Sequence, residues 1–172
     1  LADEGRIRAA TRPSDAPGGK RFGEFVHRLL QKADVEDLTA VAAKAAADLQ
    51  VPTRDADEAL ELVEKALASP LLERARQATA KWHELPFSLK TDEGVVEGSI
   101  DLVFREGDGL VVVDFKTDQV GPDGAEEAAE AYAPQLRQYA GALAKLTGMP
   151  VSETIVFFLR PLVEVRQTGE GT

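Results

Sequence analysis

Residues 110–118, with the sequence LVVVDFKTD, place the strongest constraint on how this chain folds. A short continuous run of apolar residues such as LVVV is typical of a strand that is buried in a sheet. The strand ends, however, in charged residues at alternate positions, Asp114, Lys116 and Asp118. Side chains two residues apart on a strand point to the same face. We therefore expect a buried sheet with acidic and basic groups gathered at the end of one strand.

The rest of the chain predicts helices first and strands afterwards. Apolar residues at helical spacing and a high alanine content predict helices at residues 20–33, 35–49, 55–69 and 71–83. Alternating patterns between Gly-containing turns predict strands at residues 84–91, 95–104 and 110–117. A helix over 125–148, broken or restarted near Pro134, and a last strand over 151–161 complete the pattern. This order predicts an α/β domain with a small mixed central sheet of about four to five strands flanked by helices.

The composition excludes several classes of site and partner. The chain of 172 residues has no cysteine, which excludes disulfides, zinc–thiolate sites and cysteine-ligated iron–sulfur clusters. It also fits a cytoplasmic location. No apolar run approaches the roughly 18 residues of a membrane span, so no membrane partner is expected. The net charge of −10 and the pI near 4.7 have the wrong sign for a protein that captures nucleic acid with a basic face.

The turn between the second and third strands decides which charged residues meet. A two-residue loop at 107–108 places Asp101 opposite Asp114, whereas a loop at 108–109 places Asp101 opposite Lys116. Directly opposed residues share a face of the sheet. Either register therefore puts Asp101, Asp114 and Lys116 on one face, provided that the loop has two residues and the strands have no bulge.

Two buried carboxylates this close repel each other, and a divalent cation between them removes that cost. Ligands that are all oxygen favour magnesium or manganese over softer metals. Lys116 would then orient or deprotonate an attacking water, or offset negative charge in a transition state. The alternative is a surface salt bridge between Lys116 and either Asp101 or Asp114, and the hairpin alone does not decide between the two.

The pattern D-(x)12-D-x-K at residues 101–116 resembles the PD-(D/E)XK nuclease signature. Further motifs occur in the order and spacing of the RecB/AddA-type branch of that superfamily: GEFVH (23–27), ELPFSL, VEGSIDLVF, VVVDFKTD and YAPQLRQY. The resemblance covers residues 20–160 and is greatest to the C-terminal nuclease domain of helicase–nucleases. It implies a restriction-endonuclease-like core with an added N-terminal helical block.

The resemblance also implies roles for individual residues. The implied metal ligands are His27, Asp101, Asp114 and the main-chain carbonyl of Phe115. Lys116 matches the catalytic lysine. Gln135 and Tyr139 match a Q-x-x-x-Y element that reaches toward the metal site or the DNA backbone. Without the resemblance, His27 would be interpreted as a half-buried core histidine, and Gln135 with Tyr139 as a buried structural pair.

Four other polar residues have less defined roles. Glu84 corresponds to an acidic residue that precedes the first strand in the family, and both metal ligation and a supporting role at the helix end stay open for it. Glu97 is expected near the rim of the site, on the face of Asp101. Asp118 is expected to order the loop after the strand. His83 matches no motif and is expected to be structural.

The implied domain organisation is one nuclease domain. Residues 1–19 are expected to form an arm or linker, 20–83 a helical block with the His27 helix, 84–162 the nuclease core, and 163–172 a tail. The chain starts without Met, and we expect it to be a piece of a larger helicase–nuclease with a UvrD/Rep-like helicase upstream in the same polypeptide.

The expected function is metal-dependent cleavage of DNA as the nuclease module of an AddA/RecB-like helicase–nuclease in double-strand break repair and recombination. The cofactor would be Mg²⁺, with Mn²⁺ as a substitute, and no iron–sulfur cluster. The chain has no ATP-binding P-loop, so a helicase motor would deliver single-stranded DNA, which accounts for the acidic charge. A second nuclease/helicase subunit is a further expected partner. The basic residues Lys20, Arg21 and Arg137 are candidates to line a DNA path. Alternatives are a free-standing single-strand or flap nuclease, and an inactive domain that binds DNA or a partner subunit.

Overall fold

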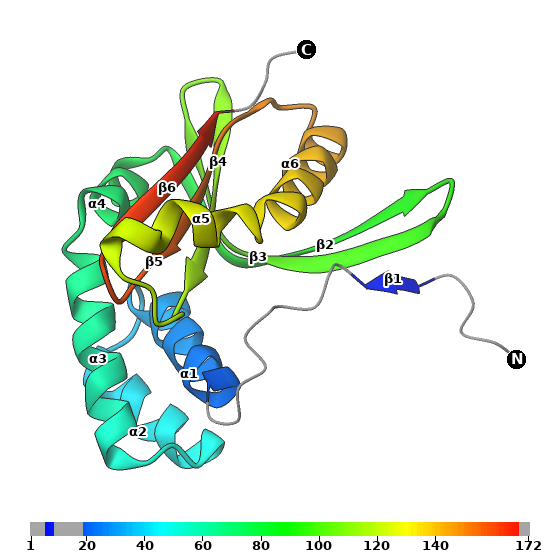
Figure 1. Cartoon of the computed structure of the whole chain (residues 1–172). Helices are drawn as coiled ribbons and strands as arrows, with labels where there is room; N and C mark the ends of the chain where they lie inside the picture. The colour runs from blue at the N-terminus through cyan, green and yellow to red at the C-terminus, as the bar shows by residue number, and fades with distance from the viewer. Residues whose placement is uncertain (1–5, 9–18, 169–172) are drawn as a thin grey trace, which may run out of the picture.

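The structure, a computed structural model, describes residues 6–8 and 19–168 of the chain (Figure 1). Within this part, a mixed sheet of six strands lies between two groups of helices. The predicted α/β class is confirmed. None of the helices in the described part of the chain combines the length and apolar character needed to span a bilayer.

Four helices cover one face of the sheet. They are α1 (Gly19–Lys32), α2 (Leu38–Leu49), α3 (Thr53–Leu67) and α4 (Pro70–Gln77). Two of them begin at a capping side chain: Asp37 accepts a hydrogen bond from Ala40 N, and the Ser69 hydroxyl accepts one from Leu72 N. The predicted helix over 71–83 is wrong after Gln77, since the chain turns to an extended conformation at residue 78 and joins the sheet.

The sheet contains the four predicted strands and two further ones. Its strands are β1 (Arg6–Arg8), β2 (Ala80–Thr91), β3 (Gly94–Glu106), β4 (Gly109–Lys116), β5 (Val151–Phe158) and β6 (Val163–Thr168). They are ordered β1-β3-β4-β5-β6, and β2 also pairs with β3. The β3–β4 pair is antiparallel and the β4–β5 pair is parallel. Strand β1 lies in the expected arm, of which residues 1–5 and 9–18 lie outside the described part of the chain and Gly19 begins α1. Strand β6 lies in the expected tail, of which residues 169–172 lie outside the described part.

The opposite face of the sheet is covered by a short 3₁₀ turn, η1 (Pro122–Gly124), and by α5 (Ala125–Glu130) and α6 (Ala133–Thr147). The predicted break near Pro134 is confirmed, because α6 starts afresh with this proline in its first turn, where a missing N–H is tolerated. The left-handed Gly148, with φ of 69°, ends α6.

Strand β4 is buried along its whole length, as predicted from its apolar run. Val111, Val113 and Phe115 belong to the core cluster shared with α1 to α4. Leu110 and Val112 belong to the cluster shared with α5 and α6. Because side chains alternate along a strand, Asp114 and Lys116 lie on the same face of β4 as Leu110 and Val112 and point to the side of α6.

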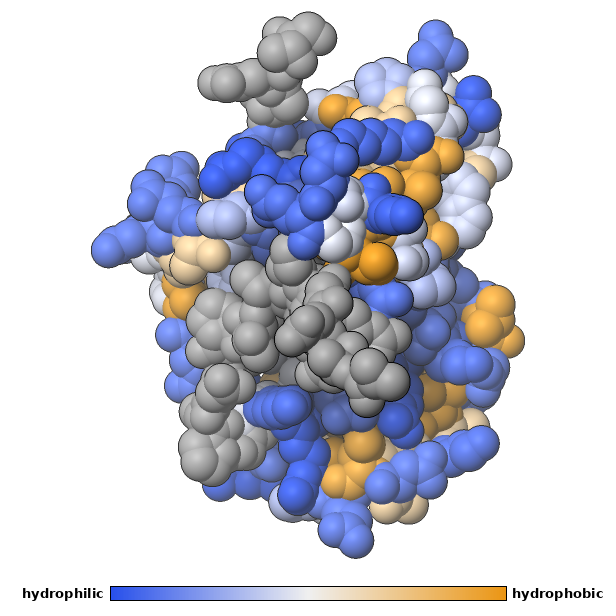
Figure 2. All heavy atoms as spheres, turned by 90° about the vertical axis from the view of Figure 1, so that its right-hand side faces the viewer, coloured by the Kyte–Doolittle hydropathy of each residue, from blue (hydrophilic) through white to orange (hydrophobic). Residues whose placement is uncertain are grey.

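The β2–β3 hairpin extends far from the body of the sheet (Figure 1). It is called the arm from here on and is distinct from the N-terminal arm expected at residues 1–19. Figure 2 shows the side of the molecule toward which this arm points, where apolar side chains form only small patches among hydrophilic ones. The arm bends at Glu84, a residue other than glycine with a positive φ of 46°. This bend and the end of β4 together define the candidate site.

Candidate active site

The site forms where β3 and β4 stop pairing. The pairs run from Glu106 with Gly109 to Leu102 with Val113, so the loop is at 107–108, the first of the two predicted registers. Gly107 adopts the positive φ of 56° that a two-residue hairpin turn requires. Beyond Leu102, β3 pairs only with its other neighbours, while β4 continues beside β5. A gap therefore opens between the two strands at Asp101 and Asp114.

The Asp101 side chain occupies this gap. Its Oδ2 accepts a hydrogen bond of 2.8 Å from the Phe115 main-chain N–H, in place of a bond between the two strands. Asp101 is 3% exposed, and it lies close enough to raise the pKa of Asp114. The structure thus brings the two carboxylates together, as the hairpin register predicted.

Helix α1 brings His27 to the same gap. Its Nδ1 lies 3.2 Å from Asp101 Oδ1, and its Nε2 lies 3.1 Å from the Phe115 carbonyl oxygen. Gly23 precedes His27 by one helical turn and faces Thr117, just beyond β4. A Cβ atom on Gly23 would lie only 3.3 Å from Thr117 Oγ1, so the glycine lets α1 approach the end of the strand closely. This close contact explains why a glycine precedes the histidine by four residues in the G-x-x-x-H pattern.

Glu84 completes the cluster from the bend in β2. Its Oε1 lies 3.7 Å from His27 Nδ1, and its Oε2 accepts a hydrogen bond of 3.1 Å from Ser99 Oγ. Each of His27, Glu84 and Asp101 offers a ligand atom within 4.8 Å of the others. A left-handed backbone at a residue other than glycine costs on the order of 1 kcal/mol, and such strain is concentrated at functional sites.

Asp114 and Lys116 form a buried pair beside this cluster. Lys116 Nζ lies 2.6 Å from Asp114 Oδ2, and the two residues are 5% and 2% exposed. The contact does not have the angles of a hydrogen bond, and within the described part of the chain neither atom has another hydrogen-bond partner. Burial, and then the nearby Asp101 charge, raise the pKa of Asp114 from 3.8 to about 6. Buried polar atoms without a regular hydrogen bond are uncommon in proteins.

Comparison with known proteins decides the family. The model of the PD-(D/E)XK nuclease superfamily matches residues 1–170. The chain belongs to this superfamily. The resemblance predicted from the motifs is therefore confirmed, and the gap between β3 and β4 holds the residues that match the superfamily's signature.

Relatives of this PD-(D/E)XK domain are much longer proteins. The chain is 32% identical over 168 residues to an ATP-dependent helicase/nuclease subunit of Carboxydothermus hydrogenoformans, covering 86% of this chain and 14% of that protein. The protein of the same name from Acetivibrio thermocellus is 31% identical over 154 residues, covering 78% of this chain and 12% of that protein. A solved structure from Vibrio cholerae aligns with a TM-score of 0.34 and 9% identity over 84% of this chain and 43% of its own, too weakly to support an argument.

The Q-x-x-x-Y residues of the PD-(D/E)XK domain lie on α6, facing the sheet. Gln135 Nε2 donates a hydrogen bond of 2.7 Å to the Tyr139 hydroxyl, and both side chains are buried. The Tyr139 ring contacts Phe87 of the arm edge-on, with 5.5 Å between ring centroids. Tyr139 belongs to the same core cluster as Val112, on the side of β4 that carries Lys116.

One residue at the site belongs to a quoted motif, YAPQLRQY, but was given no role of its own. Tyr132, just before α6, places its ring centroid 4.1 Å from Lys116 Nζ. Its hydroxyl donates a hydrogen bond of 2.9 Å to Asp118 Oδ1, which gives Asp118 the ordering role expected for it. Tyr132 is the first residue of that motif, three positions before Gln135.

The remaining candidates do not belong to the cluster of His27, Glu84 and Asp101. His83 Nε2 lies 3.0 Å from Asp34 Oδ2, which also binds Lys81, in agreement with a structural role for His83. Glu97 is exposed on the arm. The possible DNA-path residues Lys20, Arg21 and Arg137 are all exposed.

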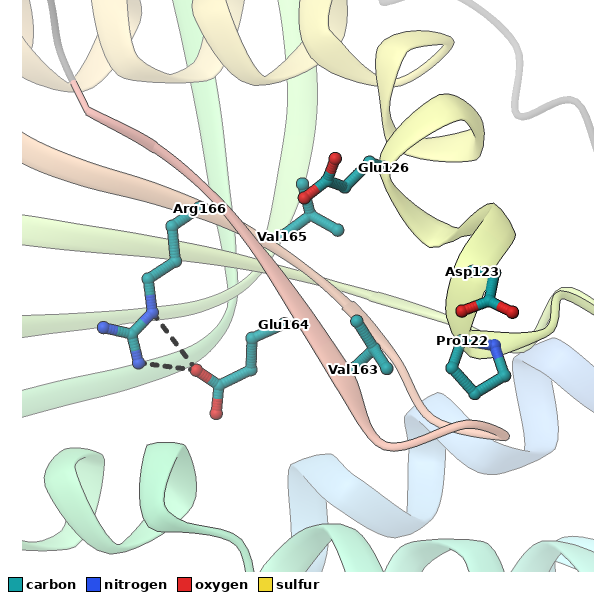
Figure 3. A pocket seen from close by; sticks show the side chains of 7 residues that line it. All are labelled: Pro122, Asp123, Glu126, Val163, Glu164, Val165 and Arg166. Atoms are coloured by element: carbon teal, nitrogen blue, oxygen red, sulfur yellow. Dashed lines mark hydrogen bonds and ion pairs between the residues drawn. The ribbon is translucent and has the colours of Figure 1, made fainter.

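A separate cavity of about 500 Å³ lies between η1, α5 and β6 (Figure 3). It is lined by Pro122, Asp123, Glu126, Val163, Glu164, Val165 and Arg166. The basic group, Arg166, is paired with Glu164 at 2.7 Å. None of the nuclease-signature residues lines this cavity, so it is distinct from the candidate active site.

Proposed function

We propose that this domain is a magnesium-dependent deoxyribonuclease of the exonuclease type, acting as the nuclease module of an AddA/RecB-like helicase–nuclease in double-strand break repair and recombination. One observation carries the proposal. His27, Glu84, Asp101 and the Phe115 carbonyl converge in the gap between β3 and β4, next to a buried acid–lysine pair that lacks hydrogen-bond partners in the described structure.

The geometry of this gap fits a small divalent cation. Adjacent ligands in an octahedral magnesium site are about 3 Å apart, since each bond is about 2.0–2.1 Å long. His27 Nδ1 lies 3.2 Å from Asp101 Oδ1 and 3.7 Å from Glu84 Oε1, so these three groups can meet at one ion. The Phe115 carbonyl oxygen lies 3.1 Å from the other ring nitrogen, Nε2, so it binds the same ion once the imidazole ring has turned. Oxygen ligands with one imidazole suit magnesium or manganese. In the proposal the ion is held by His27, Asp101, Asp114 and the carbonyl of Phe115, and Glu84 binds either the ion or one of its waters.

When bound, the ion polarises a phosphoryl oxygen and lowers the pKa of an attacking water. The other contributions come from the protein's own groups. The Phe115 N–H holds the Asp101 carboxylate in place, so this ligand needs no rearrangement. The Lys116 ammonium lies in a buried setting, where its charge acts strongly on negative charge that builds up on the scissile phosphate.

Gln135 and Tyr139 take a positioning role in this proposal. They lie on α6, which packs on the face of β4 that carries Asp114 and Lys116. Their mutual hydrogen bond orients the Tyr139 hydroxyl. We infer that this pair contacts the DNA backbone beside the scissile phosphate.

The acidic charge of the domain is consistent with DNA that is supplied by another part of the protein. The relatives are named as helicases as well as nucleases, and this chain matches only 14% of the first of them. We infer that a motor in the same polypeptide delivers single-stranded DNA to the site, in the cytoplasm, and that a second nuclease/helicase subunit joins the complex. Lys20, Arg21 and Arg137 are then local contacts along the path.

A cleavage assay tests this function. The purified domain is incubated with end-labelled single-stranded DNA in magnesium, manganese, calcium or chelator. We expect products in magnesium and manganese only. Lys116→Ala should abolish most of the cleavage, while Lys145→Ala, a matched change at an exposed lysine on α6, should not. Cleavage in chelator would contradict the proposal, and so would cleavage by Lys116→Ala at the wild-type rate.

A further inference from the structure

Lys116 has an aromatic neighbour that belongs to neither the D-x-K nor the Q-x-x-x-Y motif. The Lys116 Nζ atom lies 4.1 Å from the centroid of the Tyr132 ring. Both side chains are buried, with 4% of Tyr132 and 5% of Lys116 exposed. A cation this close to a ring face is attracted to it, and the attraction grows where water is excluded.

The Tyr132 ring is held from several sides. Its hydroxyl donates a hydrogen bond of 2.9 Å to Asp118 Oδ1, two residues beyond Lys116. Its ring packs against Phe158 of β5, with 6.3 Å between the ring centroids. A hydrogen bond from a phenol to a carboxylate is strong and leaves more electron density on the ring. The ring therefore offers Lys116 a fixed and electron-rich face.

The other close partner of Lys116 is the Asp114 carboxylate, at 2.6 Å. A carboxylate as the sole partner would draw the ammonium toward itself and occupy its donors. A ring face attracts the charge without accepting a directed hydrogen bond, so it leaves the N–H groups available. This matters most if Asp114 is itself a metal ligand, because its charge is then shared with the ion.

We propose that Tyr132 is a positioning residue whose ring face holds the Lys116 ammonium in place for the phosphate. The proposal deepens the nuclease function proposed above and rests on it for the role of Lys116. The contact between Lys116 and Tyr132 does not depend on catalysis, so it can be measured without metal or DNA.

The contact is tested by NMR of the protein labelled with ¹³C at the lysine ε-carbons. The ε-methylene protons of Lys116 should be shifted upfield by the Tyr132 ring current, and their resonance is identified by its loss in Lys116→Arg. Tyr132→Phe keeps the ring and should keep the shift. Tyr132→Leu should lose it. A wild-type Lys116 resonance without an upfield shift would overturn the proposal, whether or not Tyr132→Leu folds.

The role is tested by single-turnover cleavage and manganese affinity. Tyr132→Leu should slow cleavage by about tenfold to thirtyfold, the range of a desolvated cation–π contact. Tyr132→Phe should stay within about threefold of the wild type, and manganese affinity should be unchanged in both. In a Lys116→Ala background, Tyr132→Leu should have no further effect, since coupled residues are not additive.

A merely structural tyrosine would give other results. Tyr132→Leu would then slow cleavage by the same factor with or without Lys116, which would overturn the proposal. Equal losses in Tyr132→Phe and Tyr132→Leu would also overturn it, because they would point to the hydroxyl and not the ring. An inactive wild-type domain would contradict the nuclease function, and the NMR shift would still decide the contact.

Discussion

Replacing Asp114 by Asn should stabilise the metal-free domain at neutral pH. The Asp114 carboxyl is buried and lies near Asp101, and these two causes raise its pKa from 3.8 to about 6. The folded protein therefore binds this proton more tightly than the unfolded chain does. The stability that depends on the proton is complete below about pH 4 and is lost as the pH rises through about 6.

The size of the effect follows from the pKa of Asp114. A difference between 3.8 and about 6 corresponds to about 3 kcal/mol, at about 1.4 kcal/mol for each pH unit. Asparagine resembles the protonated carboxyl in shape and does not ionise. We expect Asp114→Asn and the wild type to have similar free energies of unfolding near pH 4. At about pH 8 the variant should be more stable by about 2–3 kcal/mol.

Urea unfolding in the presence of chelator, between about pH 4 and pH 8, measures this difference. Asp108→Asn serves as the control, because Asp108 is exposed at the turn of the same hairpin and the change should alter stability little at any pH. Manganese should then stabilise the wild type more than Asp114→Asn, since only the wild type keeps the ligand. A difference that does not change with pH, or a variant less stable than the wild type at pH 8, would refute the reasoning.

Three further predictions concern the metal, the DNA and the arm. Calorimetry should show greatly weakened manganese binding in His27→Ala and unchanged binding in His83→Ala; wild-type affinity in His27→Ala would remove His27 from the ligand set. The isolated domain should bind DNA weakly, with a shallow dependence on salt, and tight binding at physiological salt without metal would contradict delivery by a motor. Gly98→Ala should lower the free energy of unfolding by about 1–3 kcal/mol, because its Cβ would lie 2.8 Å from the Phe87 ring; an unchanged stability in urea would show that the ring can move aside.

Local patterns were sufficient to predict most of the sheet and the acid–lysine pair. The run at 110–113 predicts the buried strand, and the spacing of two between Asp114 and Lys116 places both on one face, as the structure shows. Strand β6 also has an alternating pattern, with Val163 and Val165 packed against the core, but it follows a proline and was assigned to the tail. A short edge strand of this kind is stabilised by its neighbour more than by its own sequence.

The features that were missed depend on contacts between distant segments. No local pattern predicts the positive φ of Glu84, a residue of β2 whose side chain reaches within 3.7 Å of His27 on α1. The contact of Tyr132 with Lys116 depends on how α6 docks on the sheet. The chain leaves the helix after Gln77 because residues from 80 onward pair with β3, and this pairing overrides their helical pattern.

The central claim is that Asp114 holds a metal and Lys116 assists the chemistry at the same site. Manganese affinity and single-turnover DNA cleavage, measured together on the wild type, Asp114→Ala and Lys116→Ala, test it most directly. Asp114→Ala should lose both metal affinity and cleavage. Lys116→Ala should keep its metal affinity while cleavage falls by about two to four orders of magnitude, as for a lost acid–base or electrostatic group. Wild-type cleavage by Lys116→Ala, or wild-type metal affinity in Asp114→Ala, would contradict the account.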